Sequence, residues 1–416
     1  MRRLMWVATA AVCLTCAAAA GDARPKGDNR AIGPRGPVGP DVPLTDAERK
    51  RLARRVTVGP RTAKGVQAAC DRAAKQRTPA VFLPAGRYVF EESVRVPGGL
   101  TLLGEGAKTL CLAGGKGVRL FGVAGDGVRF TRLKLQGADA TPEPSNNSYG
   151  IVVSGRRNVR IDHCDISGFS YATDFAAEAT AQIDHCTIHH NLRSGLGYGV
   201  AIYSGAYVLV TDNEFRQNRH SLASNGALDW SSPRRAGKYL HKPGVRKTHW
   251  EFVHNRVGSS DRSRYELCAV DTHPGMDGTF VVRENLFEDL CHGVGIRDGS
   301  GVIRGNVFRN LRTVTKFRSL VAVSIRYGTH NNIPVDAAMP HNVRVEDNVF
   351  DMKPGVTYQK CKVGKAENIT IDGKLVPETK TSRPPPPMPA LREMSEDGIL
   401  RWQGAGASCR PSGPPR

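Results

Sequence analysis

Histidine, aspartate and tyrosine recur in this sequence in a pattern that suits proton transfer. Asp271 and His273 alternate in "CAVDTHPG", so on a strand both side chains would point the same way. A carboxylate can hold an imidazole in one tautomer and raise its basicity. His220 in "NRHSLASNG" is a second candidate base, and Tyr198 in "LGYG" is a candidate proton donor. These four residues are therefore our predicted catalytic residues.

Basic side chains at matched places predict a site for anions. Arg297 in "GVGIRDG" and Arg326 in "AVSIRYG" each follow an apolar alternation and precede a turn. Guanidinium groups pair with carboxylates through two parallel hydrogen bonds. Arg219, beside His220, and Lys316, between the two arginines, could add positive charge. We therefore assign Arg219, Arg297, Arg326 and Lys316 to substrate binding.

Two groups of potential metal ligands are weaker candidates for a site than the residues above. A zinc set is offered by the repeated "IDHC", which contains His163, Cys164, His185 and Cys186. A calcium set is offered by Asp162, Asp165, Asp174 and Asp184. Cysteines and histidines that are adjacent on strands face different ways, and the spacing of the acids is not diagnostic. We expect no metal and no other cofactor, with calcium as the alternative.

A motif that is repeated seven times identifies the elements that must position these side chains. Segments such as "VRIDHCDI" and "VRVEDNVF" carry apolar residues on alternate positions around a central Cys or Asn. The central residues are Cys164, Cys186, Asn213, Asn255, Asn285, Asn306 and Asn348. The shorter spacings fit one turn of a parallel β-solenoid, and the longer ones fit a turn with an inserted loop. Stacked Asn amides in the bends could hydrogen-bond to each other and to the backbone.

The rest of the chain is divided by composition. Residues 1–20 read as a secretory signal peptide, and residues 21–57 as a flexible leader with a short helix that Thr45 caps. A second helix is expected at 62–75, with Val66, Ala69, Cys70 and Ala73 as its apolar stripe. The solenoid would occupy 58–372. Residues 373–416 would form a Pro-rich linker and a C-terminal tail that caps it.

These features together resemble a known superfamily. A helix, a "LPAGRY" turn, "VRVPGGLTLLGEG" and then Asn-centred rungs are similar to pectate-lyase-like right-handed parallel β-helix proteins, including secreted bacterial right-handed β-helix region proteins. The resemblance covers roughly residues 58 to 372 and implies an all-β fold, a single-stranded right-handed parallel β-helix with an N-terminal capping helix. It implies no single function, because such scaffolds include polysaccharide lyases, glycoside hydrolases, epimerases and non-catalytic adhesins.

Export would permit disulfides. Cys268 with Cys291, Cys361 with Cys409, and Cys70 with Cys111 are possible pairs, whereas Cys164 and Cys186 would stay as buried thiols in the ladder.

The net charge of +20 indicates a polyanionic partner. For an exported monomer without a membrane span, acidic polysaccharide or an anionic cell-wall polymer fits better than nucleic acid. We expect an extracellular lyase that cleaves a uronate-containing polysaccharide by β-elimination, although epimerisation shares the first half of that chemistry. One alternative is an inverting glycoside hydrolase that uses Asp271, Asp277 and Asp298. The other is a non-catalytic glycan-binding or cell-wall-binding solenoid.

Overall fold

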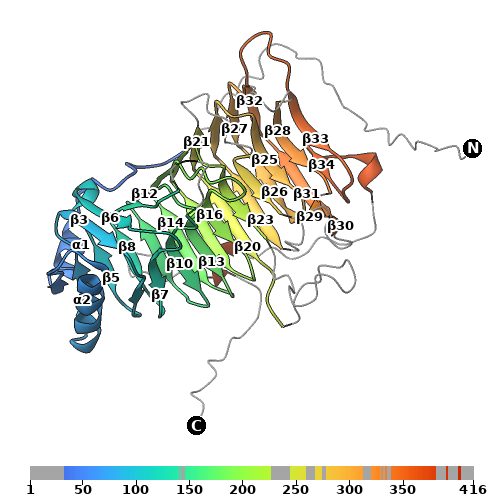
Figure 1. Ribbon diagram of the computed structural model, residues 1–416. Coiled ribbons are helices and arrows are strands. Elements are labelled where there is room, and N and C mark those ends of the chain that lie inside the picture. Colours follow the sequence, from blue (N-terminus) through green and yellow to red (C-terminus); the bar gives the residue numbers. More distant parts are fainter. Residues whose placement is uncertain are drawn as a thin grey trace, which may run out of the picture.

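The computed structural model describes residues 32–139, 141, 146–225, 244–258, 268–273, 278–312, 320–327, 329–330, 333–334, 339–380, 390–391 and 402–403. The chain coils into an elongated solenoid with a helix at one end (Figure 1). Each complete coil contributes one strand to each of three sheets, and the pairing between successive coils is parallel.

The first sheet, here sheet A, contains thirteen strands. They are β1 (Arg55–Thr57), β2 (Ala80–Phe82), β5 (Thr101–Leu103), β8 (Arg129–Thr131), β11 (Val159–Asp162), β14 (Thr180–Asp184), β17 (Tyr207–Thr211), β20 (His249–Val253), β23 (Thr279–Arg283), β26 (Gly299–Arg304), β31 (Pro340–Glu346), β34 (Thr370–Ile371) and β35 (Lys374–Leu375). The last of these, β35, pairs antiparallel with β34 and ends the regular winding.

Sheets B and C contain ten strands each. Sheet B comprises β3 (Gly86–Phe90), β6 (Thr109–Ala113), β9 (Lys134–Gln136), β12 (Asp165–Ser167), β15 (Thr187–His189), β18 (Glu214–Arg216), β21 (Arg256–Gly258), β24 (Leu286–Glu288), β27 (Val307–Arg309) and β32 (Val349–Asp351). Sheet C comprises β4 (Val94–Val96), β7 (Arg119–Val123), β10 (Tyr149–Ser154), β13 (Tyr171–Ala176), β16 (Tyr198–Ile202), β19 (His220–Ser224), β22 (Val270–Thr272), β25 (His292–Ile296), β28 (Val321–Ile325) and β33 (Gln359–Val363). Small hairpins are formed by β29 (Thr329–His330) with β30 (Ile333–Pro334) and by β36 (Ala390–Leu391) with β37 (Trp402–Gln403). This is the right-handed parallel β-helix that the sequence predicts.

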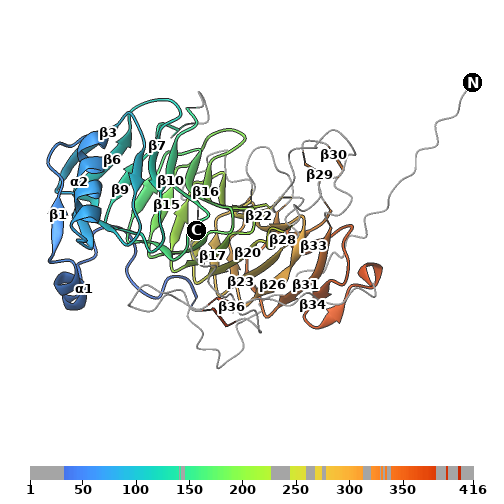
Figure 2. The same cartoon turned by 90° about the horizontal axis from the view of Figure 1, so that it is seen from below.

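Both expected helices are present. Helix α1 (Asp46–Arg51) has the predicted cap at Thr45, which forms a reciprocal capping box with Glu48. Helix α2 (Ala63–Lys75) begins after Thr62 and buries Val66, Ala69, Cys70 and Ala73 against the first coils, as the apolar stripe predicts. Short 3-10 turns lie at η1 (Gly106–Lys108) and η2 (Pro377–Thr379). Figure 2 shows α2 at the end of the solenoid, where it covers the open core.

The predicted ladder occupies the bends between sheets A and B. Asn285 Oδ1 accepts from the backbone N–H of Asn255 at 2.8 Å, and Asn285 Nδ2 donates to Asn306 Oδ1 at 2.9 Å. The same pattern links Asn213 to Asn255 and Asn306 to Asn348. Cys164 and Cys186 continue the stack, with the Cys164 N–H donating to Cys186 Sγ at 3.4 Å. The ladder prediction is therefore confirmed.

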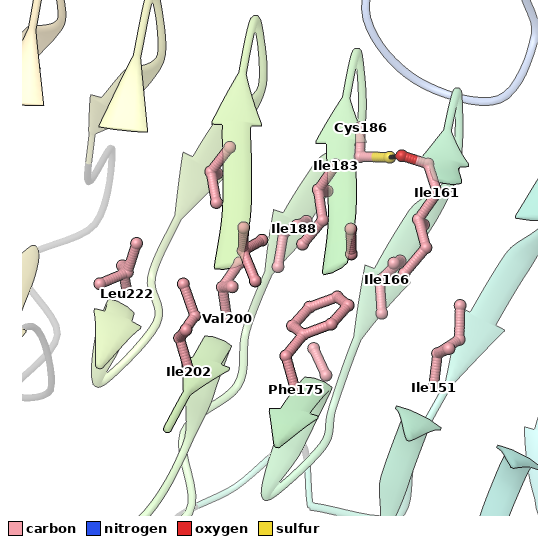
Figure 3. Close-up of a cluster of buried hydrophobic side chains, with 14 of the residues drawn as sticks. Ile151, Ile161, Ile166, Phe175, Ile183, Cys186, Ile188, Val200, Ile202 and Leu222 are labelled. Atoms are coloured by element: carbon pink, nitrogen blue, oxygen red, sulfur yellow. Dashed lines mark hydrogen bonds between the residues drawn. The ribbon is translucent and has the colours of Figure 1, made fainter. Parts of the chain in front are cut away.

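Inside the coils, one apolar core runs along the axis. Ile161, Ile183, Phe175 and Val200 stack from coil to coil, each fully buried (Figure 3). The Cys186 thiol points at the Ile161 carbonyl, 3.6 Å away. Because neighbouring coils are joined by both backbone ladders and this packing, outward side chains sit on a rigid frame.

Part of the predicted leader contacts the solenoid. Residues 32–44 lie along the bends between sheets A and B (Figure 1, blue), and we call this segment the strap. Arg35 donates to both carboxylate oxygens of Asp212, at 2.9 and 2.6 Å. Gly39 donates its N–H to the His185 carbonyl at 2.8 Å, and Arg132 binds the Val42 carbonyl at 2.7 Å.

The expected disulfides are not formed among the described residues. Cys70, Cys111, Cys268, Cys291 and Cys361 take part in no disulfide there. Cys409 lies outside the described residues. Cys164 and Cys186 are buried thiols in the ladder, as predicted. Stability among the described coils therefore comes from the packed core and the ladders.

Candidate functional site

Four neighbouring strands of sheet C bring the predicted catalytic residues and Arg297 together. Tyr198 begins β16 and lies in register with His220, which begins β19. Asp271 lies in the middle of the next strand, β22, and His273 follows that strand directly. Arg297 comes directly after β25, the strand beyond. We call His220, Asp271, His273 and Arg297 the His–Asp–Arg cluster.

Asp271 is the centre of this cluster. Its Oδ2 atom lies 3.2 Å from His273 Nε2 and 3.7 Å from His220 Nε2. Arg297 holds both oxygens, with Nε donating to Oδ1 at 3.1 Å and Nη2 binding Oδ2. Burial alone would raise the pKa of Asp271, but the hydrogen bond from His273 and the charges of His220, Arg297 and His273 hold it well below its usual range. The carboxylate is therefore ionised and can orient His273 through its Nε2–H.

His220 has a different environment. His220 is buried, with 4% of the residue exposed, and its Nδ1 donates to the Cys268 carbonyl at 2.7 Å. Burial lowers the pKa of His220 to about 3, although the charge of Asp271 opposes this. The imidazole is therefore neutral at physiological pH, and its Nε2 lone pair faces the cluster. His273 is more accessible, with 17% of its side chain exposed.

Tyr198 closes one side of the cluster. Its ring centroid lies 5.6 Å from that of His220 and 5.9 Å from that of His273. Arg219 donates to the Tyr198 hydroxyl at 3.4 Å and to the Leu196 carbonyl at 3.3 Å. Burial raises the pKa of Tyr198, so the phenol keeps its proton at neutral pH. The hydroxyl can thus serve as a proton donor.

The remaining predicted binding residues lie further along the solenoid. Arg326 follows Ile325, the register partner of Ile296, so it stands one coil beyond Arg297 on an exposed edge of sheet C. The matched "Ile-Arg" pairs therefore do fall on adjacent coils. Lys316 lies outside the described residues.

The calcium set does not assemble, because its four acids belong to three sheets. Asp162 and Asp184 lie on sheet A, where Arg129 binds the first at 2.6 Å and Arg160 binds the second at 2.8 Å. Asp165 is on sheet B, 3.3 Å from His189, and Asp174 is on sheet C. The zinc set is also divided, since Cys164 and Cys186 face the core while the two histidine rings stack on the outer bend at 5.1 Å.

The His–Asp–Arg cluster itself offers three metal-binding atoms. One atom each from His220, Asp271 and His273 lies within 4.8 Å of the others. A cation there would face the guanidinium of Arg297, which already binds both oxygens of the carboxylate. The donor set therefore fits acid–base chemistry better than a resident metal.

Two of the acids of the hydrolase alternative, Asp271 and Asp298, lie in the described part of the chain, and each has a hydrogen-bond partner. Asp271 is bound by Arg297, and Asp298 is 1% exposed and accepts the N–H of Gly299 at 2.7 Å. Asp277 lies outside the described part of the chain. An inverting hydrolase needs a carboxylic acid and a carboxylate that face the same bond.

Some contacts of the cluster had no signal in the sequence. The Cys268 carbonyl that fixes the His220 tautomer belongs to the backbone, and the Thr272 hydroxyl accepts from the Arg297 N–H at 2.7 Å. The side chain of Asp174, considered only as a calcium ligand, lies on the same face as Asp271, as described below. Only the register of sheet C brings these groups together.

Comparisons with known proteins agree with this architecture. Residues 117–314 match the family model described as "Right handed beta helix region". The fold and this match define a right-handed parallel β-helix protein. No curated protein sequence matches the chain.

One solved structure with a similar fold is a glucanase. The catalytic domain of a GH87 alpha-1,3-glucanase in complex with nigerose has a TM-score of 0.51 at 13% identity. That alignment covers 80% of this chain and 58% of the glucanase structure, so this chain spans little more than half of it. At that identity the likeness concerns the fold alone.

Two further structures have lower scores. An alginate lyase from Paenibacillus sp. has a TM-score of 0.36 at 15% identity, covering 75% of this chain and 99% of the lyase. The A-module of a mannuronan C-5 epimerase from Azotobacter vinelandii has a TM-score of 0.42 at 12% identity, covering 75% and 96%. The matched structures thus carry several different functions, and they include a surface adhesin of Streptococcus pneumoniae.

Proposed function

We propose that the protein is an extracellular polysaccharide lyase that acts on a uronate-containing polymer. The observation that carries the proposal is the His–Asp–Arg cluster together with Tyr198 beside it. They place an oriented imidazole, a buried phenol and a guanidinium group on one face of sheet C. β-Elimination needs these three kinds of group: a base, an acid and a positive charge beside the carboxylate of the sugar.

His273 is the base in this scheme. Its Nε2–H points at Asp271, so Nδ1 carries the lone pair that can take the proton next to the uronate carboxylate. Arg297 uses Nε and one Nη group on Asp271, and its second Nη group can bind the substrate carboxylate. This stabilises the charge that develops on that carboxylate as the proton leaves.

Tyr198 is the acid. Its buried hydroxyl can donate a proton to the glycosidic oxygen as that bond breaks, and the Arg219 guanidinium beside it stabilises the phenolate that remains. His220, neutral and held by the Cys268 carbonyl, is a positioning residue that fixes the packing around Asp271. The +20 net charge supports an acidic substrate, and the signal-like start of the sequence supports export.

The test is turnover on a panel of acidic polysaccharides, read by the absorbance of the unsaturated uronate product. His273→Ala should lower the rate about 10²–10⁴-fold without a matching loss of thermal stability, since that is the usual contribution of an acid–base group. His163→Ala is a matched control, because His163 lies on the bend between sheets A and B, away from sheet C. Full activity of the His273 variant would reject this base.

Two other outcomes would replace the proposal. Exchange of the uronate proton with solvent deuterium without chain cleavage would make the protein an epimerase. Binding without either reaction, on every polymer of the panel, would favour a non-catalytic glycan-binding solenoid.

A further inference from the structure

The outer face of sheet C continues from the cluster toward the N-terminal cap. Along one row, Asp271 is in register with Ala223, Ala223 with Ala201, and Ala201 with Asp174. With about 4.8 Å between neighbouring strands, the two aspartates are about 14 Å apart along the axis. The two alanines between them leave no large side chain in this row. The alanines are 2% and 4% exposed and pack with Tyr171, Tyr198 and Tyr203, so an elongated molecule that reaches from one carboxyl group to the other would lie over these rings.

Asp174 forms no ion pair with the residues that the structure describes. It is 7% exposed, and its Oδ1 atom has no hydrogen-bond partner among the described residues. By contrast, Asp162, Asp184 and Asp271 each have an arginine at hydrogen-bonding distance. A buried polar atom without a partner costs about 1–3 kcal/mol. Such a cost is usually explained by a ligand or by function.

The surroundings of Asp174 are polar at one point and aromatic elsewhere. Tyr203 packs against Ala201, the register neighbour of Asp174. Burial raises the pKa of Asp174 to about 6, although Tyr203 and the charge of Arg119 act to lower it. Above a pH of about 6 the Asp174 carboxyl is ionised, and in this form it accepts hydrogen bonds and repels other anions. It can bind the hydroxyl groups of a sugar but not the carboxylate of a uronate.

A line of tyrosine rings runs beside this row. Tyr149 and Tyr171 are stacked with centroids 4.9 Å apart, and Tyr171 meets Tyr198 edge to face at 5.3 Å. Tyr198 in turn lies against His220, so the rings lead from the cluster to Asp174. Tyr171 and Tyr149 are partly exposed. Exposed rings beside a hydrogen-bonding group are suited to the apolar face and the hydroxyl edge of a pyranose.

The opposite end of the face is different in charge. Beyond Asp271 the same row passes through Gly295 and Ser324 to Lys362, with Arg297 and Arg326 at its edge. The C-terminal part of this row is therefore cationic.

We propose that Asp174, Tyr203 and Tyr171 form a second sugar subsite that binds the hydroxyl groups of an uncharged unit. This inference rests on the proposed function, because it takes the substrate of the His–Asp–Arg cluster to be one chain along the axis of the solenoid. It narrows the substrate class to a mixed polysaccharide, with the uronate bound at the arginines and a neutral sugar bound toward the N-terminal cap.

The experiment is calorimetric titration in a His273→Ala background, so that substrate is bound and not consumed. One probe is an oligosaccharide of alternating uronate and neutral hexose, and the other is an oligosaccharide of uronate alone with the same length. The parent should bind the mixed probe at least tenfold more tightly. Asp174→Ala should remove that preference and leave the affinity for the pure uronate probe within about twofold.

Controls separate folding from recognition. Asp174→Asn keeps the shape of the side chain and should fold, as checked by thermal denaturation, yet should also weaken binding of the mixed probe. Asp165→Asn on sheet B is the matched control and should bind like the parent. Equal affinity of the parent for both probes, failure of the parent to bind the mixed probe, or an Asp174→Ala variant that keeps the preference would each overturn the subsite.

The two proposals can fail separately. If the mixed probe is preferred through Asp174 but is never cleaved by the protein with His273 intact, the subsite stands and the lyase assignment is lost. If a pure polyuronate is cleaved through His273 and the preference is absent, the lyase stands and the subsite is lost.

Discussion

At the scale of single residues, three acids show how their surroundings decide their chemistry. Asp271 is buried and bound by Arg297, so it stays ionised and can orient His273. Asp212 is held in the same way by Arg35 of the strap, whose hydrogen bonds lower its pKa although burial opposes them. Asp174 has no arginine at ion-pairing distance within the described part of the chain, and burial raises its pKa. The same residue type therefore serves orientation, attachment and, in our proposal, recognition.

The raised pKa of Asp174 predicts a pH-dependent stability. The native carboxyl, with a pKa of about 6, keeps its proton at pH values where the unfolded side chain, with its ordinary pKa of 3.8, has lost it. The native state then binds more protons, so the free energy of unfolding falls as pH rises from about 4 to 6. Asp174→Asn removes this loss, which is on the order of 2–3 kcal/mol. Denaturant unfolding of variant and parent should diverge over that range, and a constant difference would contradict the buried carboxyl.

Arg297 predicts a split between charge and geometry. Arg297→Lys keeps the positive charge but loses the two-pronged contact with Asp271, so His273 would be oriented less well. We expect kcat on an acidic polysaccharide to fall about tenfold or more, with a smaller change in KM. Arg304→Lys, an exposed arginine paired with Asp347 on the bend of sheet A, is the control and should leave both unchanged. Unchanged kinetics of Arg297→Lys would limit Arg297 to a charge.

At the scale of elements, the ladder makes the clearest stability prediction. The Asn285 amide has four hydrogen bonds: from the N–H and Nδ2 of Asn255, to the Phe252 carbonyl and to Asn306 Oδ1. Asn285→Leu removes all four bonds and leaves the buried Asn255 N–H without its acceptor. Each buried group left unsatisfied costs about 1–3 kcal/mol. Arg283→Leu, an exposed change on the same coil, should cost far less. A thermal shift equal to that of this control would remove the structural role of the ladder.

The strap predicts a local effect. Arg35→Ala breaks its contact with Asp212 and leaves that buried carboxylate without its cation. Hydrogen exchange at the Gly33 and Gly39 amides, which bond to the Glu284 and His185 carbonyls, should become faster, with only a modest fall in Tm because Arg35 is partly exposed. Arg54→Ala, an exposed change outside the strap, is the control. Exchange rates equal to those of the parent would show that the backbone contacts alone hold the strap.

The sequence predicted the strands and coils better than it predicted the contacts between side chains. The repeat around Asn213 and Asn285 identifies the coils, because a buried amide stack needs one residue type at one position of each turn. Alternation places Asp271 and His273 on one side of a strand, and the contact at 3.2 Å confirms it. Which side chains meet across coils depends on loop lengths. The pairing of Asp271 with Arg297, the separation of Asp162 from Asp174 and the docking of Arg35 on Asp212 therefore required the register of the sheets.

At the scale of the whole molecule, the regular spacing of the coils fixes the distances between the groups on sheet C. Coils at a fixed spacing set the distance between the arginines, the His–Asp–Arg cluster and Asp174, and α2 and the antiparallel β35 end the winding. No helix among the described residues is long and apolar enough to cross a membrane. Because neighbouring coils are joined by hydrogen bonds along their length, a polymer on sheet C would meet an almost rigid row of groups.

The net charge of +20 predicts salt-dependent binding. Attraction between exposed charges is screened over about 10 Å at 0.1 M salt and about 3 Å at 1 M. The affinity of the His273→Ala variant for a polyuronate should therefore fall steeply between those concentrations. The contribution of Asp174 and the tyrosine rings, which is made by short-range contacts to an uncharged unit, should persist. The mixed oligosaccharide should thus lose less affinity than the pure uronate one, and a neutral glucan of equal length shows the loss caused by salt alone. An affinity for polyuronate that does not change with salt would mean that the positive charge of the molecule takes no part in holding its substrate.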